Sequence, residues 1–138
     1  MLTGLQKIKG ILDTISANDL PFKFEYLESQ PTSFPCGMVV SEGFTEELQD
    51  SQNNMVTETF VIKLIFSQEE SQTGYEKWMT LADLISAEFR KGSHQTLDGT
   101  SILMKIKQGL APQFSPDYSQ AVVVFGIVIE VQIIKSII

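Results

Sequence analysis

Two glutamates stand inside strongly apolar segments, a setting in which a carboxylic acid can do acid–base chemistry. Glu58 lies within the run from Val56 to Phe66, and Glu130 follows the nine apolar or small residues 121–129. Apolar surroundings shift a carboxyl pKa toward the range that such catalysis needs. A place at the end of a strand or the edge of a sheet explains such residues more often than catalysis does, so we interpret both as structural.

A cysteine and a histidine could form a nucleophilic pair, and the chain has one of each, Cys36 and His94. They are far apart in sequence, and Cys36 has neither a basic neighbour nor an adjacent helix start to stabilise a thiolate. We therefore interpret Cys36 as a buried or half-buried structural residue. A structural zinc site takes about four ligands, which one Cys and one His do not supply. A single cysteine also excludes an intramolecular disulfide and is typical of a reducing compartment.

The remaining composition argues against the common ligand classes. The two Gly-rich motifs that bind phosphate groups, GxxxxGK(S/T) and GxGxxG, do not occur in the sequence. Seventeen acidic and ten basic residues give a net charge of −7, which disfavours a general nucleic-acid binder. The apolar run 121–129 is shorter than the about 20 residues of a membrane helix, and no secretory signal is recognisable. We expect a soluble intracellular protein that is not an enzyme and has no catalytic, cofactor-binding or metal-binding residues.

The most acidic segment is also the least periodic. From Glu42 to Asn54 the chain is polar without a clear repeat, which predicts a long loop. Loops of that length in compact domains are usually functional or disordered. Its acidic residues, Glu42, Glu46, Glu47 and Asp50, form the one candidate functional surface.

The elements that would carry this loop follow from hydrophobic spacing. The predicted helices span about residues 2–17 and 75–89, and the predicted strands span about residues 22–26, 37–40, 56–66, 102–106 and 120–135. Residues 108–119, with Gly109 and two prolines, are predicted to form a second long loop. Strands that do not alternate regularly with helices indicate an α+β class. We expect one domain over residues 1–138, a mainly antiparallel sheet of about five strands with two amphipathic helices packed on it.

The last predicted strand is apolar on both faces over much of its length. Val123, Phe125 and Ile127 lie on one face, and Val122, Val124 and Val128 on the other. Such a strand is central or covered on each side. If both helices pack on one face, the other face needs a partner, which suggests self-association.

In order and length of elements, nearly the whole chain resembles the tail terminator and tail-completion (neck) proteins of long-tailed bacteriophages. The matching segments are the amphipathic helix Leu2 to Ile15, the strand after a proline (Phe34 to Val40), the acidic loop, the strand Thr59 to Phe66, the helix Tyr75 to Phe89 and the long final strand. None of these is a signature motif, so the resemblance lies in their order and lengths.

The resemblance implies a structural virion protein of the tail or neck, assembled in the host cytoplasm. Such a protein forms a homo-oligomeric ring, commonly a hexamer, that caps the tail tube, stops its polymerisation and docks to the head-side connector. DNA would pass through the ring without specific binding, and an acidic loop lining the lumen would repel its phosphates. The alternatives are another head–tail joining or tail tube protein, a non-viral α+β binding module and, third, an enzyme dependent on Cys36 or His94.

Overall fold

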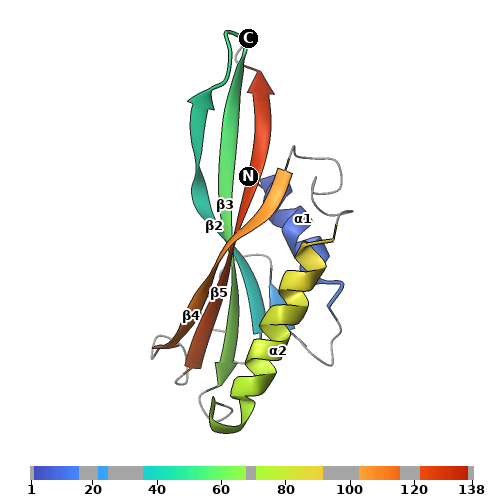
Figure 1. The fold of residues 1–138 in the computed structure, drawn as a ribbon, viewed down its shortest axis with the longest axis vertical. Helices are drawn as coiled ribbons and strands as arrows, with labels where there is room; N and C mark the ends of the chain where they lie inside the picture. The colour runs from blue at the N-terminus through green and yellow to red at the C-terminus, as the bar shows by residue number, and fades with distance from the viewer. Residues whose placement is uncertain are drawn as a thin grey trace.

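The computed structural model describes residues 2–15, 22–24, 36–67, 71–91, 103–115 and 122–136. The elements run in the order α1 (Leu2–Leu12), β1 (Phe22–Phe24), β2 (Cys36–Leu48), β3 (Asn53–Ser67), α2 (Ser71–Phe89), β4 (Leu103–Ser115) and β5 (Val122–Ser136). Both helices lie on the same side of one long, strongly twisted sheet (Figure 1). The predicted α+β class is confirmed.

The sheet has the strand order β1-β2-β3-β5-β4. Its antiparallel part consists of four strands rather than five, because the short β1 pairs with β2 in parallel. β3 and β5 form the centre and pair from Asn53 opposite Ser136 to Ser67 opposite Val122. The two-faced last strand is therefore an interior strand, one of the two positions expected for it.

Alternation along β3 and β5 divides the sheet into two faces. The face toward the helices carries the main core, in which Phe60, Ile62 and Leu64 pack with Ile127 and Ile129. The helices contribute Leu5, Ile8, Ile11, Leu12, Leu81, Ile85 and Phe89 to this core. On the helix-free face, Cys36, Met38 and Ile65 form a second small buried cluster.

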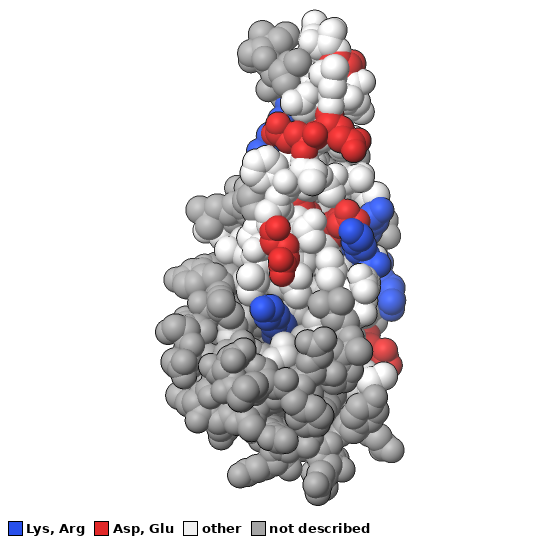
Figure 2. All heavy atoms as spheres, turned by 90° about the vertical axis from the view of Figure 1, so that its left-hand side faces the viewer, with Lys and Arg blue, Asp and Glu red and all other residues white. Residues whose placement is uncertain are grey.

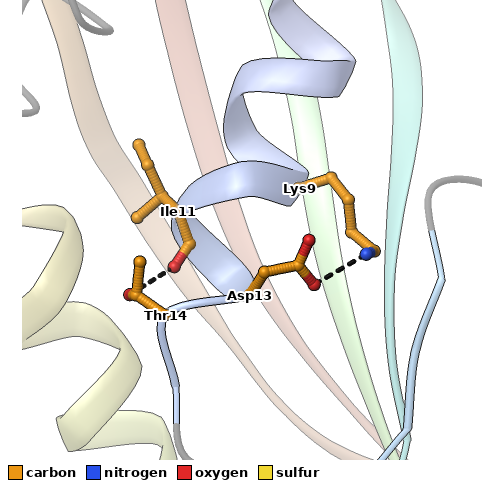
Figure 3. A network of polar contacts seen from close by, with 4 residues as sticks. All are labelled: Lys9, Ile11, Asp13 and Thr14. Carbon is orange, nitrogen blue, oxygen red and sulfur yellow. Dashed lines mark hydrogen bonds and ion pairs between the residues drawn. The ribbon is translucent and has the colours of Figure 1, made fainter.

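Helix α1 ends at Leu12, five residues earlier than predicted. The amide of Thr14 donates to the carbonyl of Ile11, and that of Ile15 to Leu12, so the chain tightens into a turn there. The Thr14 hydroxyl donates to the same Ile11 carbonyl at 2.6 Å, and Lys9 Nζ lies 2.7 Å from Asp13 Oδ1 (Figure 3). Ile15 is buried beyond the helix end, so its position continues the apolar spacing of the helix although the residue lies in a turn.

Large parts of both predicted loops are strands instead, and residues 116–119 of the second lie outside the described residues. β2 continues to Leu48 across the predicted loop Glu42–Asn54, and β4 continues to Ser115 across residues 108–115. β4 is an edge strand of the described sheet, where proline and glycine are tolerated because the outer edge needs no ladder hydrogen bonds. In β2 the side chains from Phe44 to Leu48 are exposed, so no burial pattern marks the strand. Of the described aromatic side chains, Phe60, Phe66, Phe89 and Phe125 are buried, whereas Phe44 is exposed.

The close approach of α1 to β3 requires a glycine at position 4. A Cβ on Gly4 would lie 2.9 Å from Cζ of the fully buried Phe60 ring, whereas one on Gly10 would meet nothing within 4 Å. We expect Gly4→Ala to lower the free energy of unfolding by about 1–3 kcal/mol through overpacking. The matched change Gly10→Ala should raise it by up to about 1 kcal/mol through helix propensity. Urea denaturation of both variants measures this; equal stabilisation by both would contradict the packing of α1 on Phe60.

Candidate functional site

The outer halves of β2, β3 and β5 extend beyond the helices as a three-stranded arm (residues 43–57 and 131–136; Figure 1). Large apolar side chains are exposed on it: Leu48 is 71% exposed, Phe44 55% and Ile134 43%. Phe44 and Leu48 are on the side of the sheet that carries the helices, since they pair with Glu58 and Asn54; Ile134 is on the other. Phe44 and Leu48 share one face with the exposed Glu46 between them, so this surface mixes apolar and charged side chains, as the rim of a protein interface does.

Three of the four predicted acidic residues lie on strand β2 rather than in a loop. Glu42 is the extra residue of a bulge, where the register shifts between Ser41 and Gly43. Gly43 has a φ of 100°, a conformation that strongly favours glycine, and its amide donates to the Ser41 hydroxyl at 3.3 Å. The extra residue exchanges the two faces of the strand beyond the bulge. Before it, Val39 and Ser41 lie on the helix-covered face, and after it the even-numbered Phe44 does.

Glu46 and Glu47 lie on opposite faces of the arm, because adjacent strand residues alternate. Glu46 pairs with Val56 and Glu47 with Met55. Both are exposed. The prediction of one acidic loop is therefore wrong, because these two side chains cannot line the same surface of a sheet.

Asp50 has a local structural role in the β2–β3 turn. Its Oδ1 accepts hydrogen bonds from the amides of Gln52 and Asn53 at 2.8 and 2.9 Å, and the Asn53 side chain also donates to it. These bonds, with that of the Gln52 amide first, hold the pKa of Asp50 below its ordinary value of 3.8. Asp50 therefore shapes the turn that fixes the register of the arm.

On the face drawn in Figure 2, acidic side chains form a band at the end that the arm occupies, and other acidic side chains lie lower down. β2 is the outermost strand on the left of the upper half in Figure 1, so Figure 2 views its edge there. Red acidic atoms form a band across this end, whereas blue basic atoms are more frequent lower down along one side (Figure 2). The exposed acidic residues of the arm are Glu46, Glu47 and Asp50.

Glu58 and Glu130 are not at strand ends or sheet edges, contrary to the interpretation of the sequence. Both lie within the central strands β3 and β5. Glu58 is only 1% exposed, and its Oε1 is 3.5 Å from the Cβ position of Gly4 in the first turn of α1. The positive end of the helix dipole lies there and favours a nearby anion. Glu130 is half-buried on the helix-free face, opposite Lys105.

Cys36 is fully buried in the second cluster, as the sequence indicated. Burial raises the pKa of its thiol from 9.0 to about 12, so the group is a neutral thiol at physiological pH and a poor nucleophile. His94 lies outside the described residues. Among the described residues, no group of three or more His, Cys, Asp or Glu side chains could hold a metal ion. No helix in the described part of the chain has the length and hydropathy needed to cross a bilayer.

No protein-family model matches this chain, and no curated protein matches it in sequence.

Sequence reasoning missed the exposed apolar residues of the arm. Phe44 and Leu48 are four residues apart, and the charged Glu46 lies between them on the same face of the strand. We interpreted the segment as a loop because polar residues outnumber apolar ones there. A spacing of four residues fits one side of a helix as well as one face of a strand, so no repeat identifies this strand in the sequence.

The raised pKa of Cys36 predicts a loss of stability at alkaline pH. The folded state holds the thiol proton more tightly than the unfolded state, so this stabilisation is complete below pH 9 and is lost as pH rises from 9 toward 12. Between pH 8 and pH 10 the wild type should lose about 1.4 kcal/mol more unfolding free energy than Cys36→Ala. Urea denaturation of both proteins at both pH values measures the difference. Equal losses, or fast alkylation of native Cys36 at pH 8, would contradict its burial.

Proposed function

We propose that this chain is a tail terminator of a long-tailed bacteriophage, a structural virion protein of the tail or neck. It forms a homo-oligomeric ring, hexameric in this proposal, that caps the tail tube and stops its polymerisation. The ring then docks to the head-side connector. The protein is not an enzyme and takes no cofactor, and DNA passes it only in transit.

The observation that carries the proposal is the arm. It is a continuous extension of the central sheet, paired to its end, and it presents Phe44 and Leu48 to solvent beside acidic groups. Burying such side chains between copies contributes about 25 cal/mol per Å² of apolar surface. A protein whose task is to contact neighbouring subunits needs such a surface.

Two other readings stay open as alternatives. A head–tail joining protein or a tail tube subunit would use the same kind of surface, but a tube subunit continues to stack where a terminator stops. A non-viral α+β binding module would hold a ligand and stay monomeric. These classes differ in assembly, so assembly is the property to measure.

The primary test is native mass over a concentration series, with negative-stain images of the largest species. We expect a discrete closed ring near six subunits that does not grow further. Open stacks would identify a tube subunit instead. A monomer that neither closes into a ring nor caps growing tail tubes would contradict the terminator.

The acidic end of the arm is proposed to face the DNA channel. Like charge on the channel wall keeps DNA phosphates from sticking. Glu46→Gln and Glu47→Gln remove charge with little change of shape, and Asp50 is left intact because it holds the turn. We expect rings of unchanged mass and a lower yield of infectious virions carrying both changes. The single variants identify which face of the arm lines the channel, and an unaffected yield from the double variant would refute the channel role.

A further inference from the structure

The sheet has two edges that the described strands leave open. On one side, β1 pairs only with Cys36 to Met38, so β2 has no described partner on that edge from Val39 to Leu48. On the other side, β4 is the last strand of the described sheet. An open edge presents unpaired N–H and C=O groups that can pair with a strand from another molecule.

The two edges carry opposite charge. Glu42 is exposed on the open part of β2, and Lys105 and Lys107 are exposed on β4. Within the described residues, no ion pair involves any of these three side chains. Each edge therefore offers a charge that the other edge complements.

The open stretches also lie at the same height along the sheet. Rows of paired residues run across it and connect Phe44 to Met104, Gly43 to Lys105, Ser41 to Ile106 and Val40 to Gln108. Glu42 and Lys107 are the extra residues of two bulges, and both bulges adjoin the row of Ser41 and Ile106. If two copies stand side by side so that their rows continue one another, Glu42 of one copy lies between Lys105 and Lys107 of the other along the strand direction.

Strand direction fits as well. β2 runs antiparallel to β3, β3 to β5 and β5 to β4, so β2 and β4 of one chain run in opposite directions. Placing β4 of one copy beside β2 of the next therefore continues the antiparallel alternation. The exposed Phe44 would then stand level with Met104 on the helix-covered face, where it gains an apolar neighbour.

We propose that copies of this chain join edge to edge, with β2 residues 39–45 of one copy pairing with β4 residues 103–109 of the next, and Glu42 facing Lys105 and Lys107. The contact uses two different surfaces, and such a heterologous contact generates a ring when its rotation closes. This inference rests on the proposed ring and names the surfaces that build it. Glu46 and Glu47 lie beyond the level at which the described β4 begins, so they remain free to face the channel.

Bulges and charged residues also protect the edges of monomeric sheets from pairing. Protection works with charge of either sign, and like charge on both edges would prevent contact between copies most effectively. Opposite charge at matching height favours contact instead, which is why we choose the second copy as the occupant.

Charge reversal tests the pairing. Glu42→Lys makes both edges basic, and the double variant Lys105→Glu, Lys107→Glu makes both acidic. Each alone should need about tenfold or more protein than the wild type for half-assembly, because like charges then face each other. Mixed in equal amounts, the two variants present complementary edges at every contact and should regain rings of wild-type mass with alternating copies. Far-UV circular dichroism of each variant alone establishes that it is folded.

Glu46→Lys is the matched control, since it makes the same change of charge on the same strand, above the paired rows. It should assemble as the wild type does. Three results would each overturn the edge pairing while leaving the proposed ring intact. The first is that Glu42→Lys forms rings at the concentrations at which the wild type does. The second is that Glu42→Lys and Glu46→Lys impair assembly equally, and the third is that mixing the two charge-reversed variants restores nothing. If the wild type forms open chains instead of rings and Glu42→Lys abolishes them, the edge pairing is supported and the proposed function as a tail terminator is contradicted. A wild type that stays monomeric up to its solubility limit would overturn the pairing, and tube capping would then decide the function separately.

Discussion

The pairing of β3 with β5 is the constraint on which the rest of the structure depends. It runs unbroken from one end of the sheet to the other, and the row of Phe60 and Ile129 lies at the heart of the core. Because side chains alternate, this one register decides which residues meet the helices and which face away. A shift by one residue would place Lys63 among the helices and remove Phe60 from them. The same register sets the height of the bulge at Glu42 on β2 relative to the bulge at Lys107 on β4, because β3 and β5 connect the two edge pairings.

A strand was predictable from the sequence where one of its faces is buried and the other is more exposed. In β3 and β5 the residues that face the helices are buried from Val56 to Phe66 and from Phe125 to Val131, so the apolar repeat placed both strands within three residues of their observed ends. In the outer half of β2 both faces are exposed, and selection for burial leaves no pattern there to find. The end of α1 was misplaced for the opposite reason: Ile15 is buried through a turn, and its spacing imitates another helical turn.

The candidate surface was harder to predict than the fold, because its residues act through position rather than type. Glu42 was recognised as acidic, but its place at an open edge depends on where β1 stops pairing with β2. Asp50 looks the same as Glu46 in a charge count, yet its carboxylate is committed to two backbone amides. A hydrogen-bonded turn residue and an exposed strand residue contribute differently to a surface, and only geometry separates them.

The order of the strands in space also determines when the sheet can be completed. β2 and β3 are neighbours in sequence and form a local hairpin, but β5 reaches β3 only after α2 and β4 have been made. Contacts between distant segments form slowly because a long loop must close first. During synthesis, β3 therefore waits with an open edge and an apolar face, and the missing strand can be supplied by the same chain or by another copy. A high concentration of such incomplete chains therefore favours exchange of β5 between molecules and aggregation, whereas a low concentration favours pairing of β3 with the β5 of its own chain.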